Sequence, residues 1–66
     1  MNEVKHYSSY LQRYFDRNWG HYDESAEWHP NPASNIWVFD IREMGIRVTL
    51  TCDEYGSVRE SRMKIK

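Results

Sequence analysis

The clearest feature of the chain is a regular alternation of apolar and polar side chains over residues 35–52, interrupted around Met44-Gly45. Successive side chains of a β-strand point to opposite faces, so this alternation predicts two strands that each have an apolar and a polar face. A glycine between two such runs is typical of a hairpin, and we predict Met44 and Gly45 as a two-residue loop. One face of this hairpin then carries Trp37, Phe39, Ile41, Val48, Leu50 and Cys52.

Residues 3–18 follow a helical period instead. At about 100° per residue, their apolar side chains fall within one arc of about 140°, which is typical of an amphipathic helix. These side chains are Val4, Tyr7, Tyr10, Leu11, Tyr14 and Phe15. We predict a helix over this range, with Asn2 as its N-cap and Gly20 as a left-handed residue that ends it.

Residues 19–34 show neither period, and Pro30 and Pro32 oppose regular structure, so we predict an irregular loop. Its aromatic residues, Trp19, Tyr22 and Trp28, favour a segment that folds back on the helix or on a sheet edge.

A third strand is predicted from about Ser57 to Ile65, after a turn at residues 53–56. Its weaker alternation places Ser61, Met63 and Ile65 on the core face and Glu60, Arg62 and Lys64 on the solvent face, and charges of this kind suit an edge strand. The predicted fold is α+β in two layers: one domain over residues 1–66, with one N-terminal helix packed on a three-stranded antiparallel meander over residues 35–65.

Composition narrows the classes of function. Charged residues make up 29% of the chain and the formal net charge is −1, which favours neither a polybasic nucleic-acid binder nor an acidic mimic of nucleic acid. The single cysteine excludes an internal disulfide. No stretch resembles a signal peptide or a membrane span, so we expect a cytoplasmic protein.

The polar face of the predicted sheet carries a candidate binding patch. The two-residue loop places Arg42 opposite Arg47, and the predicted third strand brings Arg62 and Lys64 beside them. Like charges opposed across strands are mildly destabilising, so a cluster of four cations indicates a docking patch for phosphates or for an acidic protein surface. The alternative is an ordinary solvated face, since Asp40 and Glu60 lie nearby.

The aromatic residues of the loop are a second candidate. Trp28 and Tyr22 are residue types that often anchor protein interfaces, although a small domain also uses them to cap a thin core.

No catalytic or metal-binding motif stands out. His6, His21, His29 and Cys52 have suitable atoms for zinc, but their spacing matches no closed site, and a Cys-His nucleophile pair would need a third group and a pocket. We therefore expect no enzyme activity, no metal and no cofactor.

The sequence favours a small protein-binding module, an inhibitor or regulator of the kind encoded by phages and mobile elements. Two alternatives stay open: a nucleic-acid-binding module that uses the basic end of the sheet, and a structural homodimer.

Overall fold

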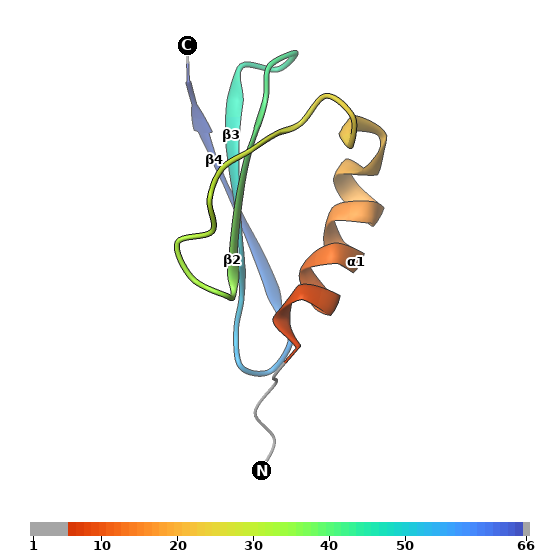
Figure 1. Cartoon of the computed structure of the whole chain (residues 1–66), viewed down its shortest axis with the longest axis vertical. Coiled ribbons are helices and arrows are strands. Elements are labelled where there is room, and N and C mark those ends of the chain that lie inside the picture. Colours follow the sequence, from red (N-terminus) through yellow and green to blue (C-terminus); the bar gives the residue numbers. More distant parts are fainter. Residues whose placement is uncertain (1–5, 66) are drawn as a thin grey trace.

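The computed structural model describes residues 6–65, which form one helical layer on one antiparallel sheet (Figure 1). Helix α1 spans Tyr7–Trp19 and continues into a short 3-10 helix, η1, at Gly20–Tyr22. The strands are β1 (Glu27–Trp28), β2 (Ile36–Ile41), β3 (Ile46–Cys52) and β4 (Val58–Lys64), and they lie side by side in chain order. The predicted α+β class is confirmed, but the sheet has four strands and not three, because β1 forms inside the predicted loop.

The helix ends differ from the prediction. Residues 3–5 and the predicted cap, Asn2, lie outside the described residues. At the other end, Gly20 has φ −58° and is therefore right-handed, so the predicted left-handed cap is wrong. The chain instead tightens into η1, which carries Tyr22 back towards Trp19.

The core lies between α1 and the sheet, and its sheet half is the apolar face predicted from the alternation. Phe39, Ile41, Val48, Leu50 and Cys52 are fully buried, and they pack against Leu11, Phe15 and Trp19 of the helix. Trp37, also on this face, is partly buried at its margin. An amphipathic helix and a one-sided apolar sheet thus bury each other's apolar surfaces.

The register between β2 and β3 is shifted by two residues from the prediction. Ile41 pairs with Ile46, so the turn contains the four residues from Arg42 to Gly45 and not two. The Ile41 carbonyl accepts hydrogen bonds from the backbone N–H groups of Met44 and Gly45, and Gly45 takes the positive φ of 66° that closes the turn. A shift of two keeps every side chain on its face, so the core prediction survives while the cross-strand partners change.

The faces of β4 are the reverse of those predicted. Val48 pairs with Arg62 and Leu50 with Glu60, so Glu60, Arg62 and Lys64 lie on the face towards α1, whereas Ser61 and Met63 lie on the open face. The cause is the length of the β3–β4 turn. Asp53 N–H bonds to Ser57 O, which leaves the three residues 54–56 as the loop, one more than in the usual two-residue turn. One added residue exchanges the two faces of a strand.

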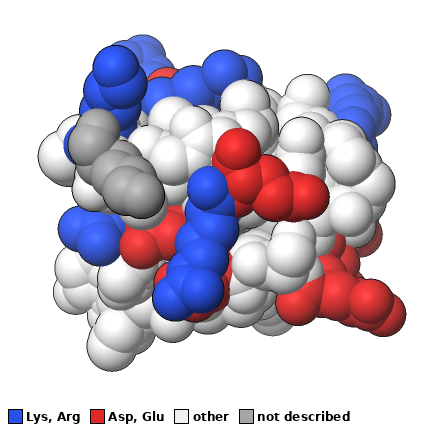
Figure 2. Space-filling view, turned by 90° about the horizontal axis from the view of Figure 1, so that it is seen from above, with Lys and Arg blue, Asp and Glu red and all other residues white. Residues whose placement is uncertain are grey.

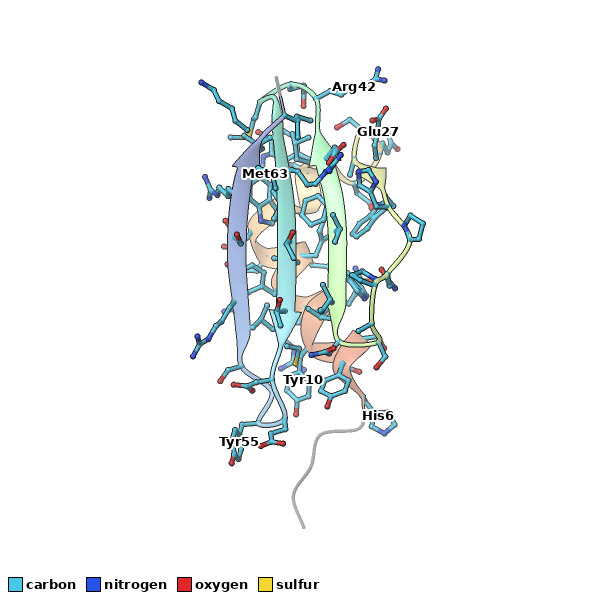
Figure 3. All side chains as sticks on the ribbon, turned by 90° about the vertical axis from the view of Figure 1, so that its left-hand side faces the viewer. His6, Tyr10, Glu27, Arg42, Tyr55 and Met63 are labelled. Atoms are coloured by element: carbon cyan, nitrogen blue, oxygen red, sulfur yellow. The ribbon has the colours of Figure 1, made fainter. Side chains whose placement is uncertain are left out.

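Among the described residues, α1 covers one face of the sheet and no element covers the other, which is turned towards the viewer in Figure 3 and from which Met63 of β4 projects. Within residues 6–65, no helix is long and apolar enough to cross a membrane.

Candidate functional site

Among residues 6–65, no strand pairs with the outer side of β4, so β4 is an edge of the sheet (Figure 3). At the two ends of the β3–β4 ladder, Asp53 N–H bonds to Ser57 O and Ile65 N–H bonds to Gly45 O. Because backbone groups alternate in direction along an antiparallel strand, the odd-numbered residues of β4 bond to β3. The N–H and C=O groups that point away from the sheet therefore belong to Val58, Glu60, Arg62 and Lys64. The opposite edge strand, β1, has only two residues.

The Glu60 carboxylate links the edge strand β4 to helix α1 through hydrogen bonds. Its Oε1 accepts hydrogen bonds from Tyr14 Oη (2.9 Å) and from Trp19 Nε1 (3.0 Å), and its Oε2 accepts one from Arg62 Nε (2.6 Å). Burial alone raises the pKa of Glu60, but the hydrogen bonds from Arg62, Trp19 and Tyr14 together outweigh it and lower that pKa below its usual range. Burial and the Glu60 carboxylate raise the pKa of Tyr14. Glu60 is thus an ionised carboxylate whose partners lie within the fold.

The guanidinium of Arg62 completes this cluster. It lies 5.1 Å from the centroid of the Trp19 ring, in the position of a cation–π contact, and more than half of its side chain is exposed. It is therefore held in place while its outward N–H groups remain accessible to a partner.

A hollow of about 350 Å³ lies beside the start of β4, between that strand and the helix. Arg13 and Arg17 line it from α1, together with Tyr10 and Tyr14, while Gly56 and Val58 form its other wall. Within residues 6–65, neither arginine makes an ion pair.

The cations of α1 and β4 around this hollow and edge form what we call the basic margin: Arg13 and Arg17 from the helix, Arg62 and Lys64 on the helix-facing side of β4, and Arg59 on its open face. Figure 2, seen from above, shows several Lys and Arg side chains along its upper edge, further basic side chains at its left and centre, and acidic groups from the centre to the lower right. The net charge of −1 therefore hides an uneven distribution of charge over the surface.

The predicted cluster of Arg42, Arg47, Arg62 and Lys64 on the open face does not form. The register shift replaces Arg42 with Asp40 opposite Arg47, and the reversed faces of β4 turn Arg62 and Lys64 towards the helix. Arg62 and Lys64 join the basic margin, whereas Arg42 and Arg47 lie elsewhere.

Arg42 and Arg47 each have a carboxylate partner. Arg42 Nε lies 2.9 Å from Glu27 Oε2, an exposed ion pair between the β2–β3 turn and β1. Arg47 donates from Nε and Nη2 to the two oxygens of Asp40, at 2.8 and 3.3 Å. His29 Nε2 lies 2.9 Å from Asp40 Oδ2. The hydrogen bonds from Arg47, with a smaller contribution from His29, overcome the effect of burial and lower the pKa of Asp40 to about 2.

The two aromatic candidates pack against the core. The Trp28 ring lies 4.9 Å from that of Phe39 and 5.1 Å from that of Phe15, while 44% of the residue stays exposed. Tyr22 lies 5.9 Å from Trp19. Both residues therefore cap the core, and their role in binding a partner stays a prediction.

Trp28 also borders a second, larger groove of about 890 Å³, opposite the basic margin. The groove runs between the first half of α1 and the segment that precedes β2. Its lining mixes aromatic rings with polar side chains, including Tyr7, Gln12, Trp37 and Asn31.

Within residues 6–65, no three His, Cys, Asp or Glu side chains gather as metal ligands would. Cys52 is fully buried, and burial, with a smaller effect of Asp53, raises the pKa of its thiol, so that it stays protonated at neutral pH.

Comparison with protein-family models, with curated proteins and with solved structures finds no match for this chain.

Proposed function

We propose that this chain is a protein-binding module that takes up an extended segment of a partner protein along the edge of β4. One observation carries the proposal: a seven-residue edge strand directs four sets of backbone N–H and C=O groups away from the sheet. Strand addition uses such groups for affinity and the flanking side chains for specificity. A module of this kind acts by occupying a segment of its partner, as an inhibitor or regulator does.

We infer that this chain binds a partner and does not catalyse a reaction, and the reason is that two carboxylates whose pKa values the fold lowers already have hydrogen-bond donors. The ionised carboxylates of Glu60 and Asp40 are both occupied by donors of the fold, so neither is placed to take a proton from a substrate.

Amide hydrogen exchange offers a direct test. The outward N–H groups of Val58, Glu60, Arg62 and Lys64 exchange rapidly in the free protein, whereas those of the intervening residues are protected by β3. A peptide selected from a random nine-residue display library should slow the exchange of the outward set by at least about tenfold. If the peptide slowed amide exchange around Trp28 and Asn31 and left β4 unchanged, it would bind in the larger groove that these residues line, and the proposal would be refuted.

A matched pair of variants separates the backbone from the side chain at one position. Arg62→Ala and Arg62→Pro both remove the guanidinium, but only proline removes the outward N–H, and an edge strand tolerates proline at such a position. We expect Arg62→Pro to bind the selected peptide at least about fivefold more weakly than Arg62→Ala does. Equal affinities would mean that no strand is added.

The basic margin also supports a second candidate, a nucleic-acid-binding module. Binding to phosphates would fall steeply as salt rises, and reversing Arg13 and Arg17 to Glu would abolish it, whereas Arg62→Pro and Arg62→Ala would behave alike.

A further inference from the structure

We propose that the partner segment is acidic, with carboxylates at two positions four residues apart on its helix-facing side and a residue without negative charge midway between them. The proposal rests on the strand addition argued above and specifies which segment the edge recognises.

An added strand alternates its side chains in step with β4. The side chains opposite Val58, Glu60 and Arg62 lie on the face towards α1, at about 5 Å from those residues. They occupy positions i, i+2 and i+4 of the partner, and each meets a different electrostatic environment.

The position opposite Val58 adjoins the hollow that Arg13 and Arg17 line. Planar guanidinium groups bind carboxylates through paired hydrogen bonds, and the hollow of about 350 Å³ can hold an aspartate or glutamate side chain. An acidic residue here therefore gains two cationic partners.

The position opposite Glu60 faces an ionised carboxylate that is already hydrogen-bonded by Tyr14 and Trp19. A second carboxylate there would be repelled and would find no free donor, since like charges directly opposed across strands are destabilising. This position thus excludes acidic residues.

The position opposite Arg62 is favourable again. The guanidinium lies over Trp19 and uses its Nε for Glu60, and the side chain is 56% exposed, so its other N–H groups can reach a carboxylate. Lys64 adds a second positive charge beyond it. The resulting pattern, acidic–x–non-acidic–x–acidic, reads the same in both chain directions.

A second copy of this chain fits the edge less well. Two β4 strands can pair antiparallel with Ser61 of one copy opposite Ser61 of the other, and their outward backbone groups then bond to each other. This register sets Glu60 opposite Arg62 of the other copy. The same register sets Lys64 of the other copy opposite Val58, beside Arg13 and Arg17, where cations repel. A segment with acidic residues opposite Val58 and Arg62 and a non-acidic residue opposite Glu60 suits all three positions.

The test uses four blocked seven-residue peptides of alternating Thr and Val, titrated by NMR at low salt. The first has Asp at its second and sixth positions, the second has Asn there, the third has Lys there, and the fourth has Asp at its second, fourth and sixth positions. We expect the two-Asp peptide to bind at least about tenfold more tightly than the Asn peptide, and the Lys peptide to show no binding. The three-Asp peptide should bind no more tightly than the two-Asp peptide despite its greater charge, because its central carboxylate meets Glu60.

Two protein variants complete the design. Arg13→Ala combined with Arg17→Ala should lower affinity for the two-Asp peptide by about tenfold and leave that for the Asn peptide unchanged. Arg42→Ala, which removes a cation paired with Glu27 away from this edge, should change neither.

The outcomes are distinct. Equal affinity for the Asp and Asn peptides, with β4 amides protected by both, would overturn the acidic pattern and leave strand addition intact. No protection of β4 by any peptide would overturn both. Protection that rises with protein concentration in the absence of peptide would identify a second copy as the occupant, and tighter binding of a single-stranded oligonucleotide than of the two-Asp peptide would identify a nucleic acid. Either result would refute the acidic-segment proposal.

Discussion

Replacing Glu60 with alanine tests the orientation of β4 directly. In the structure, the Glu60 carboxylate lies between strand and helix and accepts hydrogen bonds from Tyr14, Trp19 and Arg62. If β4 faced the other way, Glu60 would be a solvated surface residue, and its loss would cost almost nothing. The two orientations therefore predict different stabilities for one variant.

The size of the effect follows from what the substitution leaves behind. Trp19 is only 4% exposed, so its indole N–H loses its acceptor and cannot readily reach water, which costs about 1–3 kcal/mol. Tyr14 is half-buried and can recover part of its loss from solvent, while the exposed guanidinium of Arg62 loses little. We expect Glu60→Ala to lower the free energy of unfolding by about 2–3 kcal/mol.

Urea titration, followed by tryptophan fluorescence, measures this change. With a slope of about 1 kcal/mol per molar urea for so small a protein, the midpoint should fall by about 2 M or more. Glu54→Ala is the matched control, because Glu54 is exposed in the β3–β4 turn, and it should shift the midpoint by less than about 0.5 M. Combining Glu60→Ala with Tyr14→Phe should cost less than the sum of the two single changes. Equal midpoints for Glu60→Ala and Glu54→Ala would refute the orientation of β4 argued above.

Four further outcomes are expected. Phe39→Ala should cost about 3–5 kcal/mol in urea unfolding, because Phe39 is fully buried, whereas Val38→Ala on the open face should cost less than half of that. Asp40 stabilises the fold above its unfolded pKa of 3.8 and loses that contribution as pH falls towards its folded pKa of about 2, so melting curves of Asp40→Asn should depend less on pH between 4 and 2. Gly56→Ala should lower the melting temperature for two reasons: φ at this position is +88°, and the new Cβ would lie 2.9 Å from the Tyr10 ring. Adding Tyr10→Ala to this variant should relieve the contact with the ring and leave the backbone strain. Dialysis against a strong chelator should leave the melting temperature unchanged, and a loss restored by zinc would contradict the expected absence of metal.

The apolar periods of the sequence predict the helix and the inward face of the central hairpin correctly. In both segments, burial decides which face turns inward, and the apolar residues leave one solution. Burial does not determine the register. A shift of two residues buries the same side chains, so the pairing depends on the four-residue turn and on the Asp40–Arg47 hydrogen bonds, which the apolar pattern does not contain.

Strand β1 could not be predicted from local sequence. Glu27-Trp28 is too short for any period, and it follows a run of polar residues and precedes two prolines. It becomes a strand because the Trp28 ring packs against those of both Phe15 and Phe39, and this contact exists only once the helix and the sheet have met. Tertiary packing here determines the local conformation.

The predicted orientation of β4 is wrong for a related reason. Its residues are mostly polar on both faces, so hydrophobic alternation carried little information, and the only apolar side chains near its end, Met63 and Ile65, suggested the incorrect face. Two features of the chain decide the outcome. Gly56, at φ +88°, closes a three-residue loop, and Trp19 and Tyr14 present donors that need an acceptor from the strand opposite. A search of the sequence for acceptors of the helix's buried N–H and O–H groups could have identified Glu60.

The same arrangement links the stability of the edge to the partner that it can accept. Lys and Arg side chains on an exposed edge oppose pairing between identical copies, because each copy would bring its cations against those of the other. In this chain, the cations also flank outward backbone groups, and Glu60, the one carboxylate among them, is held by the helix. The charge that disfavours a second copy therefore favours an acidic strand, and Glu60 limits where the acidic residues of that strand can lie. Selectivity at this edge arises from the combination of repulsion and attraction, as specific interfaces require.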